Sequence, residues 1–215
     1  MRRRQELLTT ILTSEFGNEM NYPNALTWAD LRKAELSNEV IRTYKRLGGI
    51  LEEPPLAFGP WDICLSNFIV ELDEAQHFNR YRALSLNSYV YYVVKGFDTV
   101  EYTQYCRDHE ETCRKKMVWG KFWTSSSAEH QFGPSGKIGD LESNGSPRWR
   151  QRAFYDYLRD VFATISGIPL IRVSVYDRIE ANQQKLTVNE ILLHENEAYF
   201  DGMVKFIERK VNRTT

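Results

Sequence analysis

The segment WDICLSNFIVELDEAQHF, residues 61–78, is the most informative part of this chain. It predicts a hairpin in which a turn at residues 66 and 67 joins a short strand to a second, apolar strand at residues 68–70. The hairpin should gather four polar side chains at one end of a sheet: Asp62, Glu71, Asp73 and His77. Hard cations such as Mg²⁺ prefer carboxylate oxygens, so this pattern predicts a divalent-metal site. The alternative is that the acids only mark where a strand meets solvent, with His77 as a surface or capping histidine.

The composition favours one folded domain. The chain has 215 residues, and its 42% hydrophobic and 13% aromatic content excludes global disorder. No apolar run approaches the roughly 20 residues that span a bilayer. The basic start MRRRQE is not followed by the sustained apolar core of a signal peptide, so we expect a cytoplasmic protein without a membrane segment. The net charge of −1 leaves nucleic-acid binding open, because that binding depends on local basic patches.

Hydrophobic periodicity predicts helices around a small sheet. Helical patterns cover residues 3–16, 39–47, 81–97, 100–116, 148–165 and about 187–211. Residues 169–176 predict a strand, and Gly167 should end the helix before it. Residues 119–147, rich in glycine and serine, predict an irregular loop. The expected fold class is α/β, with a small central mixed sheet and helices on both faces.

The order of these parts resembles the PD-(D/E)XK nuclease superfamily. The most similar branch is the very-short-patch-repair-like one, with its related homing endonucleases. Residues 68–78 resemble the branch pattern Ile-Glu-x-Asp-Gly-x-x-His-Phe, after a helix that carries a glutamate at residues 37–39. Residues 152–159, Gly167 and residues 169–173 resemble its late helix, glycine and strand. The resemblance implies a restriction-endonuclease-like fold, Mg²⁺ or Mn²⁺ as cofactor, and hydrolysis of DNA phosphodiester bonds.

The resemblance covers about residues 37–78 and 148–176. It therefore implies one nuclease-like domain over residues 1–215, with an N-terminal helical extension at about 1–36 and an insertion at about 98–147. An endonuclease that cuts both strands often works as a dimer, so a homodimer is one expected state.

Each matched residue acquires an implied role. Asp62 would be the principal metal ligand, and Glu71 would be a second one through its carboxylate or its backbone carbonyl. Asp73 would hold a metal-bound water, and His77 would be the general base or would orient the attacking water. Two further acids on flanking helices would complete the site: Glu39, through a water, and Asp156. Taken alone, the helix that carries Asp156 reads as an ordinary amphipathic helix with a solvated ion-pair face.

Three positions depart from the family pattern. Asp73 stands where the wider superfamily has a lysine, which is usual in the resembled branch, and Glu74 replaces that branch's glycine. Arg159 replaces the lysine of the late helix, which keeps the charge but not its compactness. A protein that keeps the fold, has lost catalysis and binds DNA or protein is therefore the rival interpretation.

Basic residues interleaved with aromatic ones predict a path for nucleic acid near the loop at residues 119–147. The expected contacts are Lys116, Lys121, Arg148, Trp149, Arg150, Arg152 and Arg159. The alternative for the rings is that they pack the loop onto the domain. No phosphate-cradling glycine loop is present, so we expect no nucleotide cofactor.

Cys106, His109 and Cys113 have a spacing that would allow three zinc ligands on one helix. Structural zinc normally uses turns rather than a continuous helix. We therefore favour reduced cysteines that pack as small apolar residues.

Overall fold

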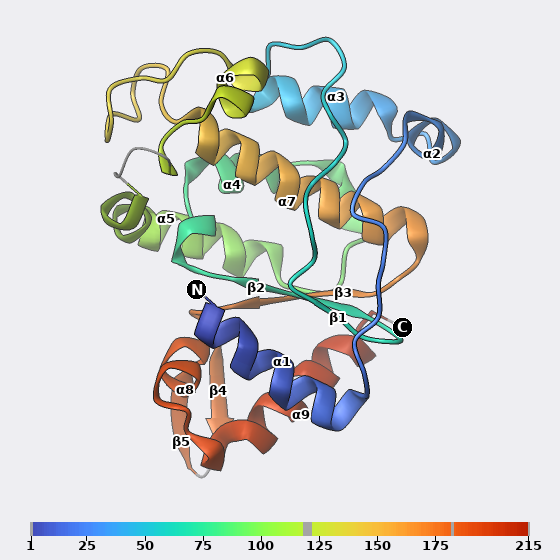
Figure 1. The fold of residues 1–215 in the computed structure, drawn as a ribbon, viewed down its shortest axis with the longest axis vertical. Helices are drawn as coiled ribbons and strands as arrows, with labels where there is room; N and C mark the ends of the chain where they lie inside the picture. Colours follow the sequence, from blue (N-terminus) through green and yellow to red (C-terminus); the bar gives the residue numbers. More distant parts are fainter. Residues whose placement is uncertain (1, 118–121, 182, 215) are drawn as a thin grey trace.

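A small three-stranded sheet lies at the centre of a mixed α/β fold (Figure 1). The computed structural model describes residues 2–117, 122–181 and 183–214. The strands are β1 (Ile63–Cys64), β2 (Ile69–Asp73) and β3 (Leu170–Ser174). β1 is antiparallel to β2, and β2 is parallel to β3 with Asp73 opposite Ser174. The predicted hairpin and the late strand are therefore confirmed, and the sheet is mixed.

Helices cover both faces of this sheet (Figure 1). One face carries α1 (Arg2–Phe16), α8 (Val188–His194) and α9 (Phe200–Asn212). On the other side lie α2 (Trp28–Lys33), α3 (Ser37–Arg46), α4 (Arg80–Ser85), α5 (Thr99–Met117), α6 (Ser126–Phe132) and α7 (Pro147–Ser166). Within the described ranges, no helix is both long enough and apolar enough to pass through a membrane.

The alternation of side chains along β2 decides where its acids point. Val70 and Leu72 belong to the hydrophobic core beneath α1, α8 and α9, whereas Ile69 belongs to the core around α7. Because successive strand residues face opposite sides, Glu71 and Asp73 must point with Ile69 towards α7. The same pleat turns Arg172 of β3 towards α7, since Ile171 and Val173 lie in the opposite core.

The long helix α7 is fixed at both ends by its sequence. The hydroxyl of Ser146 accepts a hydrogen bond from the Trp149 N–H, and Pro147 occupies the first turn, where its missing N–H costs nothing. Gly167 ends the helix in the left-handed conformation, with φ of 71°. The helix predicted over residues 148–165 is confirmed. It lies between the sheet and α3 (Figure 1), and this position explains why Asp156 is buried rather than solvated.

Several elements differ from the sequence predictions. Residues 81–97 do not form one helix: α4 ends at Ser85, and the hydroxyl of Ser88 caps a separate 3-10 turn, η2 (Tyr89–Tyr92). The segment predicted as irregular contains α6, whose N-terminus is capped by Ser125. The last helix is divided into α8 and α9 by η4 (Glu197–Tyr199) and by Glu195, which has a positive φ of 48°. The hairpin of β4 (Arg178–Ala181) and β5 (Gln184–Thr187) was not predicted.

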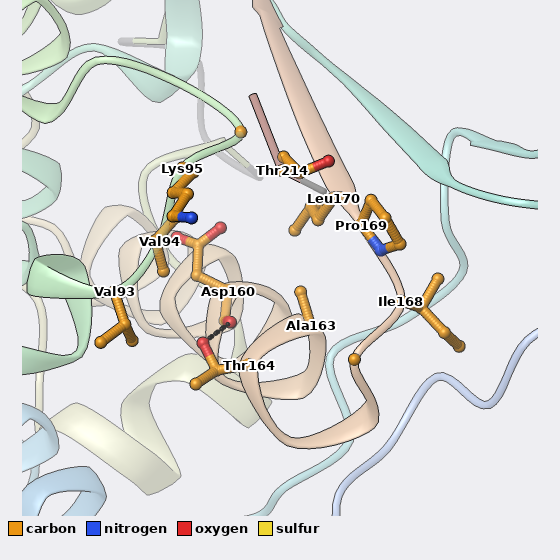
Figure 2. Close-up of a pocket in the computed structure, with 12 residues that line it drawn as sticks. Val93, Val94, Lys95, Asp160, Ala163, Thr164, Ile168, Pro169, Leu170 and Thr214 are labelled. Atoms are coloured by element: carbon orange, nitrogen blue, oxygen red, sulfur yellow. Dashed lines mark hydrogen bonds between the residues drawn. The ribbon is translucent and has the colours of Figure 1, made fainter. Parts of the chain in front are cut away.

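Gly96 allows the loop before α5 to touch the backbone of β3. A Cβ atom at this buried position would lie 1.8 Å from the carbonyl oxygen of Leu170. Both residues border a cavity of about 280 Å³, and Figure 2 shows Val93 and Lys95 on one side of it with Leu170 on the other. The cavity lies at the amino end of β3, away from the acids that end β2.

We expect Gly96→Ala to lower the free energy of unfolding by about 1–3 kcal/mol, because backbone atoms must move to admit the methyl group. Urea unfolding followed by circular dichroism measures the change. The control is Val93→Ala, at a side chain that is 61% exposed, and it should stay within about 0.5 kcal/mol of wild type. Equal midpoints for the two variants would contradict this account of Gly96.

Candidate functional site

Three polar side chains meet at the carboxyl end of β2. Asp73 ends the strand, His77 follows on the 3-10 turn η1 (Ala75–His77), and Asp156 comes from the middle of α7. The Nδ1 atom of His77 lies 2.8 Å from Asp156 Oδ2 and 3.3 Å from Asp73 Oδ1. One possible ligand atom from each residue lies within 4.8 Å of the other two. Among the residues that the structure describes, this is the only such group of three or more.

Arg172 joins this group from the neighbouring strand. Its guanidinium is fully buried and donates to both carboxylate oxygens of Asp73, each at 2.9 Å. It also donates to Asp160 Oδ1 at 2.7 Å and to the backbone oxygen of Asp156 at 2.9 Å. Arg82 pairs with the other carboxylate oxygen of Asp160 at 2.9 Å. Arg172 was not predicted as a site residue, although a charged residue inside the largely apolar run LIRVSV indicates a buried partner.

Asp156 is held in its charged form by this surrounding charge. Burial alone would raise the pKa of its carboxyl group, but the His77 ring and the guanidinium of Arg172 outweigh burial and lower the pKa. Its Oδ1 atom is buried and accepts no hydrogen bond from a described residue. The guanidinium of Arg159 lies near that oxygen, with Nη1 at 3.7 Å.

Glu71 is buried beside this group and is also paired. Its Oε1 accepts the backbone N–H of Asp62 at 3.1 Å, and its Oε2 lies 3.2 Å from Arg159 Nε. Burial raises the pKa of Glu71 to about 8, against the opposing effect of the Arg159 charge. Glu71 and Arg159 therefore form a largely buried pair beside Asp73 and Asp156.

Asp62 stands at the mouth of the site. It is half-buried, its Oδ2 accepts the Leu72 N–H at 2.9 Å, and burial raises its pKa. Asp62 and His77 line a common cavity of about 50 Å³, which is room for an ion or one to two waters. Glu74 borders the same cavity, but its carboxylate pairs with Arg4 at 2.9 Å.

Helix α1 therefore forms part of the wall of the site, a role that was not predicted from the sequence. Besides the Arg4 pair, Gln5 donates from Nε2 to the backbone oxygen of Asp62 at 2.9 Å. The carboxylate of Glu74 is neutralised by Arg4, which lies 70 positions earlier in the chain. No local pattern connects the two residues.

Glu39 is not brought to the other acids by any contact among the described residues. It is buried on α3, where it accepts the hydroxyl of Ser88 at 2.7 Å and lies 3.0 Å from Arg42. Because α7 lies between α3 and the sheet, Glu39 is on the far side of α7 from β2 (Figure 1).

The predicted nucleic-acid contacts divide into two kinds. Trp149 is only 1% exposed and packs against Trp123 with ring centroids 5.4 Å apart, so its prediction as a contact residue is corrected to a core residue. Arg159 is largely buried by its ion pairs. The remaining side chains lie nearer the surface: Lys116 is exposed, and Arg148, Arg150 and Arg152 are half-buried. Lys121 lies outside the described residues.

Cys106, His109 and Cys113 form no metal cluster with one another in the described chain. Cys106 and Cys113 are both buried, and burial raises the pKa of each thiol to about 12. The sulfur of Cys113 also contacts the backbone oxygen of Gln76. His109 instead stacks on Tyr176, with ring centroids 3.5 Å apart. The two cysteines therefore pack as small apolar side chains.

The donor atoms at the carboxyl end of β2 fit a divalent cation. Two carboxylates and an imidazole lie within reach of one ion, and the unpartnered Oδ1 of Asp156 is a buried acceptor that a cation would satisfy. Arg172 already binds both oxygens of Asp73, so a cation would share that carboxylate with the guanidinium.

The chain belongs to DUF7255, a family of unknown function whose model matches residues 42–194. The matched range contains the hairpin, η1, α7 and β3. It leaves α1 and Glu39 outside. No curated protein and no solved structure matches the chain.

Proposed function

We propose that this protein is a metal-dependent DNA endonuclease with a restriction-endonuclease-like fold, which hydrolyses phosphodiester bonds with Mg²⁺ or Mn²⁺. The observation that carries the proposal is the convergence of Asp73, His77 and Asp156 at the carboxyl end of β2. The mixed sheet between two helical layers, with Asp62 at the mouth of the site, supports the same class.

Asp73 and Asp156 would hold the cation, with Asp62 as a further oxygen ligand from the mouth. A bound divalent cation supplies a water of lowered pKa and neutralises charge on the phosphoryl oxygens. His77 would accept the proton of the attacking water at Nε2, because its Nδ1 faces Asp156 and Asp73. The two carboxylates orient the ring and stabilise the imidazolium that proton transfer creates.

The test is nicking of supercoiled plasmid by purified protein with Mg²⁺ or Mn²⁺. We expect His77→Ala, Asp156→Asn and Asp62→Ala to fall to the background of a reaction with EDTA. His194→Ala removes an exposed histidine on α8 and should leave the rate at the wild-type value. A wild-type protein that does not nick, or an Asp156→Asn variant that nicks normally, would refute the nuclease proposal.

One observation favours a second function, that of a non-catalytic DNA- or protein-binding module. Arg172 and Arg159 give Asp73 and Glu71 internal countercharges, so the acidic cluster needs no metal for its stability. This function predicts DNA binding without cleavage and no Mn²⁺ affinity that depends on Asp156. Calorimetric titration of wild type and Asp156→Asn with Mn²⁺ decides between the two functions.

A further inference from the structure

A second and larger cleft, which we call the basic cleft, lies between α5, the β4–β5 hairpin and α9. Its volume is about 650 Å³, within the range of sites that hold small ligands. It shares no lining residue with the cavity at Asp62 and His77. Six cationic side chains line it: Lys95, Arg178, Lys185, Arg209, Lys210 and Arg213.

The acids of the basic cleft are engaged with their own neighbours. Asp98 caps α5 by accepting the N–H groups of Val100 and Glu101, at 2.8 and 3.0 Å. Asp177 is buried, lies 3.3 Å from Lys210 and accepts the Ser174 N–H at 3.0 Å. The two remaining acids accept hydrogen bonds within α5, Glu101 from Tyr105 and Asp108 from Gln104. Each of the four acids therefore has a hydrogen-bond partner other than the exposed cations.

Most of the cations, in contrast, form no ion pair. Five of the six are exposed, the exception being Lys210. None of these five forms an ion pair with another residue in the described ranges. They come from four separate segments, namely the loop before α5, β4, β5 and the end of α9. Six cations against four acids leave the lining with a formal net charge of +2, and an anion bound beside the exposed cations would lower the positive potential there.

Aromatic side chains also line the basic cleft. His109 and Tyr176 both line it, and their rings are stacked with an interplanar angle of 10°. Tyr105 adds a third ring, 5.9 Å from Tyr176. Cations that hold phosphate beside a ring that can stack on a base are the recurring components of nucleotide and single-strand recognition.

We infer that the basic cleft binds a nucleotide unit, either free or as part of a single strand. The phosphate would meet the arginines and lysines, and the base would stack at His109. This inference does not rest on the proposed function, because no cleft residue belongs to the candidate hydrolytic site. The two sites are nevertheless neighbours, since Tyr176 packs against Phe78, the residue after His77, with centroids 5.3 Å apart.

The test measures binding in EDTA, so that cleavage does not enter the result. Fluorescence anisotropy of a labelled single strand of about 20 nucleotides is compared for two variants of the full-length chain. Lys185→Glu with Arg209→Glu reverses two exposed cations of the basic cleft. Lys33→Glu with Arg46→Glu makes the same change in charge at exposed positions on α2 and α3.

We expect the cleft reversal to weaken affinity by about tenfold or more and to flatten the salt dependence, because each lost phosphate contact lowers that slope. The reversal on α2 and α3 should change affinity by less than about twofold. His109→Ala should weaken binding while leaving the salt slope unchanged, since stacking releases no counterions. Thermal melting confirms that all variants are folded.

Competition with unlabelled ADP identifies the source of the nucleotide. Displacement of the labelled strand by ADP supports a free nucleotide as the ligand, and displacement only by unlabelled oligonucleotide supports a strand. Two results would overturn the inference: no binding of either probe, or equal affinity of the two charge-reversed variants. Absence of plasmid nicking would leave it standing.

Discussion

Arg172→Met is expected to lower the free energy of unfolding by about 3–5 kcal/mol, the usual cost of removing one partner from a buried ion pair. Arg172 is completely buried and compensates Asp73 and Asp160 at once. Methionine would fill much of the space but, among the residues that the structure describes, would leave Asp73 with only the imidazole of His77 within ion-pair distance. Urea unfolding near neutral pH measures the loss, and failure to fold is its extreme form.

The control is an ion pair of similar length at the surface. Arg3 lies 2.6 Å from Glu195, but their side chains are 76% and 47% exposed, so Arg3→Met should cost less than about 1 kcal/mol. Adding Asp73→Asn to Arg172→Met should recover part of the stability, because the uncompensated charge is then gone. A loss below about 1 kcal/mol for Arg172→Met would mean that Asp73 is not an ionised partner of the guanidinium.

This prediction bears on function because Asp73 belongs to two interactions. If it mainly balances Arg172, the double variant should regain part of the stability lost by Arg172→Met and should keep its DNA binding. If it also holds a cation, the double variant should lose Mn²⁺ affinity whatever its stability. Stability and metal affinity, measured on the same protein, therefore separate the binding module from the enzyme.

The sheet could be predicted because it depends on local pattern. Residues 61–78 have the apolar runs and the central turn that a hairpin requires. Gly167 is the residue type that ends a helix in the left-handed conformation, as it does for α7. The same pattern placed Asp73 and His77 together, because His77 lies on η1, only four residues after Asp73. Asp156 was predicted as a site residue only through the family resemblance. The pattern of its own helix predicted a solvated ion-pair face instead.

The rest of the site depends on contacts between distant segments. Arg172 reaches Asp73 across 99 positions, and Arg4 reaches Glu74 across 70. Neither contact follows from periodicity, which shows the face a residue occupies but not its partner. The β4–β5 hairpin was missed because its residues are charged and exposed at many positions, without the apolar run that marks a strand.

Glu71→Gln is expected to stabilise the protein relative to wild type progressively as the pH rises from about 5 to 9. The pKa of Glu71 is about 8 in the folded protein, where its ordinary value is 4.5, and the cause is burial. Between those pH values the folded state keeps a proton that the unfolded state loses. The stabilising contribution of Glu71 is therefore complete below pH 4.5 and is lost as the pH rises through 8.

Glutamine carries no charge at any pH, so the difference between the two proteins isolates this titration. The difference should grow by a few kcal/mol, with an upper limit of about 5 kcal/mol from the pKa change. The ion pair with Arg159 does not change the sign of this result, because its effect is already included in the folded pKa of about 8. Urea midpoints across the pH range provide the measurement.

Glu111→Gln is the matched control, because it makes the same substitution at an exposed site. A hydrogen bond from Arg114 lowers the pKa of Glu111, so its difference from wild type should have the opposite sign. A Glu71→Gln difference that does not change with pH would contradict the burial of Glu71 as an acid of raised pKa.

The effect of Mn²⁺ on stability distinguishes a metal site from a buried acid that is balanced only by Arg159. Metal ligands must be deprotonated, so a cation held near Glu71 should stabilise wild type more at pH 8 than at pH 5. The gain should reach about 2.7 kcal/mol when Mn²⁺ is at 100 times its Kd, and Asp156→Asn should remove it. Equal stability with and without Mn²⁺ across the range would leave Glu71 as a buried acid balanced only by Arg159. The fold would then be retained for binding rather than for hydrolysis.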